Sequence, residues 1–239
     1  MHRAYHAWES PALSRRMELI VFGHAGAPIV VFPTSMGRFY DYEDRGMVNA
    51  LSEHLERGWA QLICVDSVDA ESWYCEWAHP HGRLQRHTQY ENYVLHEVLP
   101  FVRSQNSNNF FMAHGCSYGA IHAMLFGLRH PTYFRRVLGF AGYYDTKRFL
   151  DNLEDDVTYY YNPLSFIAGL QEGPVLDDLR RLEIIMAIGK EDPAAWTNTQ
   201  LSERLWSKNI WHALRLWDGW AHDWPYWMQM MNMYIGGAD

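Results

Sequence analysis

Apolar residues along this chain occur in two arrangements: short runs that are apolar almost throughout, and longer stretches in which they recur every three or four positions. The short runs predict buried strands at roughly 28–33, 60–65, 110–113, 137–141 and 184–188. Looser alternation predicts two antiparallel lead strands and one last strand, at roughly 3–9, 15–23 and 211–217. The pattern therefore predicts about eight strands.

Amphipathic stretches separate these strands. Met47, Leu51 and Leu55 have helical spacing and are followed by a glycine stop at Gly58. The same spacing predicts further helices within 90–101, 117–128, 195–207 and 224–235. Strands that alternate with helices in this way predict an α/β fold, with a mostly parallel sheet covered by helices on both faces.

The pattern gives no sign of a domain boundary. No internal repeat, low-complexity tract or linker divides the sequence, so a single α/β domain spanning 1–239 is expected. The longest stretch without a predicted strand is 146–182. It is either a small cap over a site or an excursion that carries one or two helices.

Composition narrows the classes of function. The chain has 239 residues, of which 48% are apolar, and a formal charge of −8, which disfavours nonspecific binding to nucleic acid or to anionic membranes. Neither an apolar N-terminal run nor a membrane-length segment occurs, so a cytoplasmic protein without membrane contact is expected. The three cysteines lack C-x-x-C spacing, and neither a disulfide framework nor a metal or cofactor site is expected. A homo-oligomer is compatible with this composition.

A candidate nucleophile lies between a predicted strand and a predicted helix. Gly115-Cys116-Ser117-Tyr118-Gly119 matches G-x-S-x-G, which alone occurs by chance in roughly one chain in twelve of this length. In this context, however, the motif is typical of a sharp turn that exposes a serine hydroxyl at the carboxyl edge of a sheet. Ser117 is therefore the predicted nucleophile, and Cys116 is expected to be a buried packing residue.

A serine hydroxyl needs an imidazole to accept its proton and an acid to orient that imidazole. His222 follows the predicted strand 211–217, so it lies where a shared active-site edge requires a base. His114 is close to Ser117 in sequence, but it belongs to the end of the preceding strand and is expected to pack or to point away. His222 is therefore the predicted general base.

The acid is less sharply defined. Asp192 follows the predicted strand 184–188 and is the leading candidate, with Glu191 beside it as a rival. Asp145, after the strand 137–141, is a third candidate. Both aspartates could instead cap helices.

The oxyanion of an ester intermediate needs two backbone N–H donors. The residue after the nucleophile, Tyr118, supplies one. The second is expected from the loop at 33–38, where either Ser35 or Met36 could present its N–H.

On these motifs, and over nearly its whole length, the chain resembles the putative-esterase family of α/β-hydrolases, which includes esterase D, enterochelin esterases, feruloyl and acetyl esterase domains and the secreted mycolyltransferases. The ending His222-Asp223-Trp224-Pro225-Tyr226-Trp227 is similar to the family's His-x-Trp-x-x-Trp. The resemblance implies the α/β-hydrolase fold and a triad of Ser117, His222 and Asp192 or its neighbour. It also implies Met36 and Tyr118 as oxyanion donors, although Thr34-Ser35-Met36 stands where many members have an Asp-Gly or a Gly-Gly pair.

The sequence thus predicts a serine carboxylic-ester hydrolase that forms an acyl-serine intermediate on a small-molecule ester. Two alternatives stay open: an acyltransferase with the same triad, and a catalytically silent binding protein with this fold. Aromatic residues around Trp73, Tyr74 and Trp77, together with the 146–182 stretch, predict a small pocket that favours short acyl groups. The alternative is that these rings pack in the core and leave an open cleft.

Overall fold

The computed structural model describes residues 1–237, which fold around one eight-stranded sheet with the order β1-β2-β4-β3-β5-β6-β7-β8. The strands are β1 (Arg3–Ser10), β2 (Arg15–Phe22), β3 (Ala27–Phe32), β4 (Ala60–Val65), β5 (Met112–Cys116), β6 (Arg136–Phe140), β7 (Glu183–Gly189) and β8 (His212–Trp217). Seven of the predicted strands coincide with these to within a few residues. The predicted strand 110–113 begins later, at Met112, and extends to Cys116.

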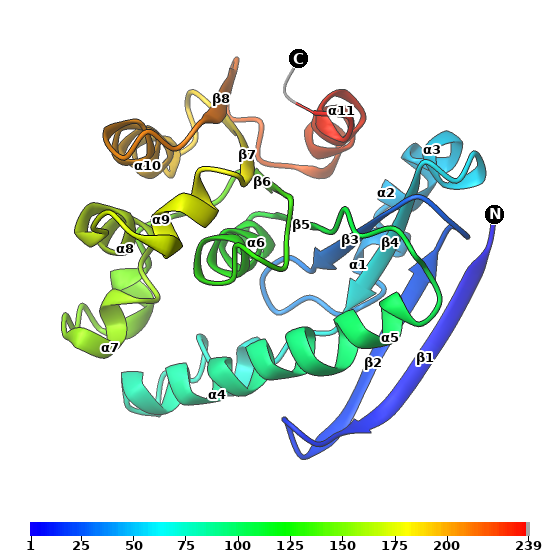
Figure 1. Cartoon of the computed structure of the whole chain (residues 1–239), viewed down its shortest axis with the longest axis horizontal. Coiled ribbons are helices and arrows are strands. Elements are labelled where there is room, and N and C mark those ends of the chain that lie inside the picture. Colours follow the sequence, from blue (N-terminus) through cyan, green and yellow to red (C-terminus); the bar gives the residue numbers. More distant parts are fainter. Residues whose placement is uncertain (238–239) are drawn as a thin grey trace.

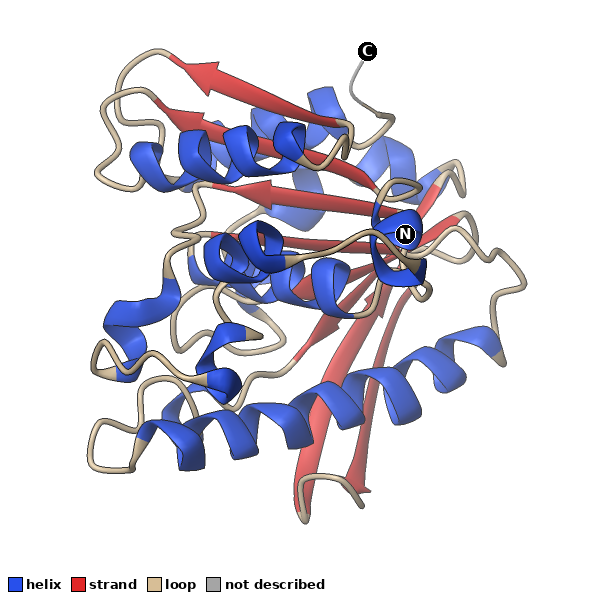
Figure 2. Cartoon of the chain, turned by 60° about the vertical axis from the view of Figure 1, so that its left-hand side comes forward, coloured by secondary structure: helices blue, strands red, loops and turns tan. Residues whose placement is uncertain are grey.

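Only the first strands of the sheet run antiparallel to their neighbours. β1 pairs antiparallel with β2, and β2 pairs antiparallel with β4, whereas all later pairs are parallel. The parallel arrows point the same way in Figure 2. The carboxyl ends of β3 and of β5 to β8 therefore meet at one edge of the sheet, which is where an α/β fold forms its site. The prediction of a mostly parallel sheet of about eight strands is confirmed.

Both faces of the sheet are buried, because side chains on a strand alternate between them. Along β7, Ile184 and Met186 join one core cluster, and Ile185 and Ala187 join the other. Helices supply the opposite walls of both clusters. One face is covered by the helices between residues 80 and 207, and the other by the helices between residues 41 and 56 and by the helix that follows β8 (Figure 1).

The helices vary widely in length. Those that cover the first face are α4 (Pro80–Tyr93), α5 (Leu99–Arg103), α6 (Tyr118–Arg129), α7 (Asp156–Tyr159), α8 (Pro163–Gly169), α9 (Pro174–Leu179) and α10 (Ala195–Ser207). The second face carries α1 (Asp41–Asp44), α2 (Met47–Ala50), α3 (Ser52–Glu56) and α11 (Trp224–Tyr234). The single helix predicted over 47–55 is thus two short helices that meet at Leu51.

The longest helical rod in Figure 1 consists of α4, a π-helical segment η2 (Val94–Val98) and α5. Pro100 lies in the first turn of α5. Proline has no N–H and clashes with the carbonyl one turn earlier, and a wider π turn before it accommodates both effects. The prediction of a helix within 90–101 is confirmed, but the rod begins ten residues earlier, at Pro80.

The stretch 146–182 contains a 3₁₀ turn η3 (Thr146–Leu150) followed by α7, α8 and α9. Leu164 and Ile167 of α8 and Leu176 and Leu179 of α9 belong to the core cluster of the first face. Most of this stretch therefore packs beside the sheet as part of the domain's helical layer. Only η3 reaches the pocket described below.

A short 3₁₀ turn, η1 (Asp69–Glu71), follows β4. Within residues 1–237, no helix has the length and apolar character needed to cross a membrane.

Candidate active site

Ser117 occupies a strained turn between β5 and α6. Its φ is 55° and its N–H donates to the carbonyl oxygen of Phe140 at 2.8 Å. The flanking glycines are required by close approach: a Cβ on Gly115 would lie 2.2 Å from the backbone of Gly119, and one on Gly119 would lie 2.4 Å from the carbonyl oxygen of Phe32. The G-x-S-x-G sequence thus forces the hydroxyl of Ser117 out of the sheet edge.

His222 and Asp192 approach this hydroxyl from the ends of β8 and β7. His222 Nε2 lies 3.0 Å from Ser117 Oγ, and its Nδ1 lies 2.5 Å from Asp192 Oδ2. The other oxygen of Asp192 accepts the N–H of Ala194 at 2.8 Å. Asp192 is 6% exposed, so its carboxylate is held from both sides in a largely buried position. The structure brings together all three residues that the sequence predicted for the triad.

The imidazole of His222 is fixed by two tryptophans. The ring of Trp220 stacks on it with centroids 5.3 Å apart, and the edge of Trp227 meets it at 5.4 Å. Ala221, between Trp220 and His222, has a φ of 42°. This left-handed conformation reverses the chain after β8, and it aims the imidazole back toward Ser117.

His114 lies away from this relay, as the sequence predicted. It is fully buried, its Nδ1–H donates to the carbonyl oxygen of Leu138 at 2.8 Å, and its Nε2 accepts the hydroxyl of Tyr42 at 3.0 Å. Burial lowers the pKa of His114 to about 4, so the ring is neutral near pH 7. Cys116 is buried beside Tyr42, and burial raises the pKa of its thiol, which fits the predicted packing role.

The other two candidate acids, Asp145 and Glu191, do not contact His222. Asp145 caps η3 by accepting the N–H of Lys147, and it also accepts the side-chain amide of Asn162 at 2.7 Å. Glu191 is exposed, and its side chain makes no hydrogen bond or ion pair within residues 1–237. Of the three predicted candidates, only Asp192 contacts the imidazole.

The backbone N–H groups of the loop after β3 differ in their hydrogen-bond partners. The N–H of Thr34 donates to Asp41, that of Gly37 donates to the carbonyl oxygen of Thr34, and that of Met36 donates to Asp69 at 3.3 Å. The N–H of Ser35 has no acceptor in the part of the chain that the structure describes.

The two candidates differ in this structure. With a φ of 56°, Met36 turns its N–H toward Asp69, and its side chain is exposed and lies outside the Ser117 pocket. Ser35 lines that pocket, and Tyr118 begins α6, where the first N–H groups of a helix have no partner in the helix itself. Within residues 1–237, the N–H groups of Ser35 and Tyr118 therefore have no acceptor.

Sequence reasoning missed the buried pair that holds this loop. Asp69 accepts both the N–H of Met36 and the Nε2–H of His122, the latter at 2.9 Å, and both side chains of the pair are about 1% exposed. His122 lies on α6, the helix that follows Ser117. Asp69 thus ties the loop that contains Ser35 to the helix that begins beside the nucleophile. An aspartate in the η1 turn carries no motif that could have revealed this.

Ser117 opens into a pocket of about 280 Å³ with aromatic walls. Tyr74, Tyr118, Tyr143, Phe149 and Trp220 all line it. A second hollow of about 500 Å³ shares Tyr74, Arg148 and Phe149 with the pocket and is otherwise lined by Trp73, Glu76, Arg83 and Asp151. Of the predicted aromatic residues, Tyr74 faces the pocket, Trp73 is 2% exposed in the core, and Trp77 is 90% exposed.

One other pocket among the described residues differs from this site. A separate pocket of about 200 Å³, over 146–165, contains neither a histidine nor a cysteine. Within residues 1–237, no cluster of three or more histidine, cysteine or acidic side chains could hold a metal ion.

Comparison with known families agrees with this geometry. Residues 41–235 match the family described as "Putative esterase". The chain belongs to this family. The match covers most of the sequence, including Ser117, Asp192 and His222, and the protein is an esterase, as its sequence predicted. No curated protein sequence matches the chain.

Solved structures of esterases share its fold. A ferulic acid esterase superposes with a TM-score of 0.77 at 15% identity, covering 97% of this chain and 95% of its own. An S-formylglutathione hydrolase from Agrobacterium tumefaciens superposes with a TM-score of 0.74 at 17% identity, covering 98% and 93%. FphF, a fluorophosphonate-binding serine hydrolase of Staphylococcus aureus, gives 0.66 at 17% identity, covering 98% and 97%. At such low identity these likenesses establish the α/β-hydrolase fold alone.

Proposed function

We propose that this esterase hydrolyses carboxylic esters through an acyl-serine intermediate, with Ser117 as nucleophile, His222 as general base and Asp192 as the acid that orients the imidazole. The observation that carries the proposal is the unbroken hydrogen-bond relay from Ser117 Oγ to His222 and on to Asp192. Two unpaired N–H groups, those of Ser35 and Tyr118, border the same pocket. Together these groups meet the geometric requirements of acyl transfer to serine.

In the first half of the reaction, Ser117 Oγ attacks the ester carbonyl carbon while its proton moves to His222 Nε2. The carbonyl electron pair moves onto oxygen, and the N–H groups of Ser35 and Tyr118 stabilise the resulting oxyanion. When the tetrahedral intermediate collapses, the bond to the alcohol oxygen breaks. That oxygen takes the proton from His222 and leaves as the alcohol, so that an acyl-serine stays behind.

In the second half, water donates a proton to His222 Nε2 and attacks the acyl carbon. Collapse of the second intermediate releases the carboxylic acid and returns the proton to Ser117 Oγ. Asp192 holds Nδ1–H throughout and stabilises the imidazolium. An alcohol in place of water would complete an acyl transfer, and product analysis with added alcohol separates the two outcomes.

A serine-directed fluorophosphonate probe tests the proposal. The wild-type protein should be labelled at Ser117 and should hydrolyse 4-nitrophenyl acetate. Ser117→Ala should abolish labelling and lower kcat by about four orders of magnitude or more, because only the catalysis of the oxyanion hole and of binding would remain. Ser35→Ala is the matched control, because it removes a pocket hydroxyl and keeps the backbone N–H. Turnover by Ser117→Ala near that of wild type would refute the proposal.

A further inference from the structure

Besides the triad, the pocket contains a cation. Arg148 lies on η3 and lines both the Ser117 pocket and the neighbouring hollow. No other lysine or arginine lines the Ser117 pocket. The mechanism proposed above gives this guanidinium no role.

Two aromatic rings hold the guanidinium in place. Its Cζ lies 4.1 Å from the ring centroid of Tyr143 and 4.6 Å from that of Phe149. These two rings are nearly perpendicular, with an interplanar angle of 88°, so the guanidinium sits in the notch between them. Contacts of this kind use the face of a guanidinium and leave the N–H groups at its edge available.

The N–H groups of Arg148 are unused in the protein. Its side chain donates no hydrogen bond and forms no ion pair within residues 1–237. Its neighbour Arg83 is the opposite case: that side chain is 2% exposed and donates to the carbonyl oxygens of Cys75 and Phe149 and to the carboxylate of Asp151. Arg83 thus fixes the backbone at Phe149. Arg148, beside it, keeps its N–H donors free.

We infer that Arg148 binds a carboxylate carried by the substrate, so that the preferred substrates are esters with one negatively charged group near the scissile bond. The inference rests on the proposed function of Ser117. The formal charge of the chain is −8, so a local cation favours the entry of an anionic ester into this pocket. One guanidinium with a free edge matches one planar carboxylate, which it can bind through two parallel hydrogen bonds.

Matched pairs of esters test the inference. Monomethyl glutarate and methyl pentanoate differ by a carboxylate on the acyl side, and 4-acetoxybenzoate and 4-acetoxybenzamide differ by one on the alcohol side. In at least one pair, wild-type kcat/KM should be about tenfold or more higher for the anion, as expected for a hydrogen-bonded ion pair. This preference should shrink as salt is added.

Variants then assign the preference to Arg148. Arg148→Gln should raise KM for the preferred anionic ester about tenfold or more and leave its kcat nearly unchanged. The kcat/KM for the neutral ester of the pair should also stay nearly unchanged. Arg148→Lys should keep part of the preference for the anion. Arg181→Gln removes an exposed arginine outside this pocket and should leave kcat/KM unchanged for both esters of the pair. If Arg148 had only a structural role, its substitution would lower kcat/KM for both esters of a pair by similar factors.

Two results would overturn the inference: equal kcat/KM for both members of both pairs in the wild type, or equal losses on both members in Arg148→Gln. Labelling of Ser117 by a fluorophosphonate separates this failure from failure of the proposed function. If the probe labels Ser117 and neutral esters are hydrolysed, a missing anion preference refutes only the role of Arg148. If Ser117→Ala keeps its turnover, the proposed function fails first.

Discussion

The residue that decides the chemistry of this site most sharply is Asp192. One of its oxygens holds His222 Nδ1 and the other accepts the N–H of Ala194, so the carboxylate cannot rotate without losing a partner. Asp145 has its own partners at the start of η3, and Glu191 points into solvent. Three acids that the sequence alone does not distinguish therefore have three different environments.

We expect Asp192→Asn to lower kcat by about four orders of magnitude, because an amide no longer selects the tautomer in which Nε2 accepts the serine proton. Asp145→Asn and Glu191→Gln, the matched controls, should leave kcat close to the wild-type value. Steady-state hydrolysis of 4-nitrophenyl acetate by the three variants measures this. A larger loss in Asp145→Asn than in Asp192→Asn would contradict the assignment of the acid.

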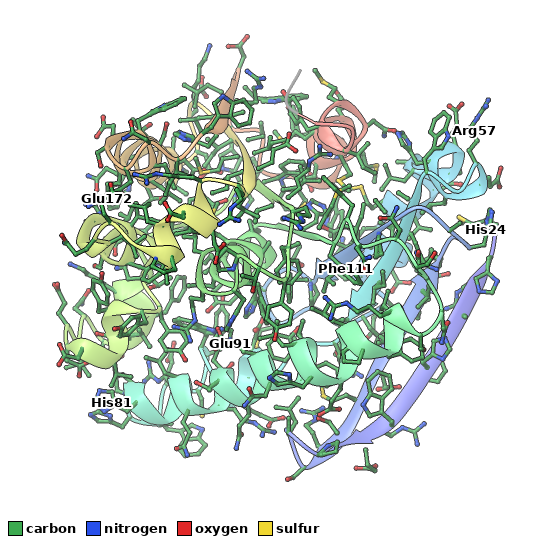
Figure 3. All side chains as sticks on the ribbon, viewed as in Figure 1. His24, Arg57, His81, Glu91, Phe111 and Glu172 are labelled. Atoms are coloured by element: carbon green, nitrogen blue, oxygen red, sulfur yellow. The ribbon has the colours of Figure 1, made fainter. Side chains whose placement is uncertain are left out.

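At the scale of elements, a buried ion pair ties α4 to α6. Glu91 of α4, labelled near the centre of Figure 3, accepts two hydrogen bonds from Arg129 of α6, at 2.7 and 3.0 Å. Burial alone would raise the pKa of Glu91, but His130 and the guanidinium of Arg129 together lower it to about 2. Because α6 carries the nucleophile turn, this pair also fixes the helix behind Ser117.

We expect Glu91→Gln to lower the free energy of unfolding at pH 7 by about 3 kcal/mol, because it leaves the partly buried charge of Arg129 without its counterion. The folded pKa of Glu91 lies below its unfolded value, so its contribution is complete above about pH 5 and is lost as the pH falls toward 2. Urea unfolding should show nearly the same difference from wild type at pH 7 and pH 5, and a smaller difference at pH 3.

The control for this prediction is Glu172→Gln, at the periphery of the molecule in Figure 3. Glu172 also pairs with an arginine, Arg180, but its side chain is 76% exposed. Solvent screens such a pair, so its loss should change stability little at any of the three pH values. Equal effects of the two substitutions would show that the Glu91 pair contributes no more than a surface contact.

At the scale of the whole molecule, the pocket forms where the sheet edge meets segments that are distant in sequence. The loops after β3, β7 and β8 supply Ser35, Asp192 and His222, and η3 supplies Phe149 and Arg148. The pocket of about 280 Å³ lies near the lower end of the range for small-molecule sites. The adjoining hollow, which a longer chain would enter, is lined by the charged residues Glu76, Arg83 and Asp151.

We therefore expect short acyl groups to be preferred. A long alkyl chain would outgrow the aromatic pocket and lie either against these charged groups or in water, and in neither place would its methylenes gain burial energy. Acetyl and butyryl 4-nitrophenyl esters should have a higher kcat/KM than the palmitoyl ester. The enzyme should show no activation at a lipid–water interface. A flat or rising series from acetyl to palmitoyl, measured with the long ester kept in solution, would contradict the small pocket.

The sequence by itself determined the strands of this protein and the order of the candidate triad residues along the chain. Buried strands must be apolar on both faces, so they appear in the sequence as apolar runs. The turn at Ser117 leaves no room for a Cβ at Gly115 or Gly119, so it appears as the G-x-S-x-G motif. Because parallel strands end at a common edge, the positions of His222 and Asp192 after β8 and β7 were also predictable.

Only the tertiary structure decided which of several equivalent groups does what. Ser35 rather than Met36 presents a free N–H because Asp69, more than thirty residues away, takes that of Met36. Arg148 is available because aromatic rings hold it and no carboxylate pairs with it in the described chain. Hydrogen bonding and ion pairing depend on distances of a few ångströms between segments far apart in sequence, and local patterns of apolar residues do not encode such distances.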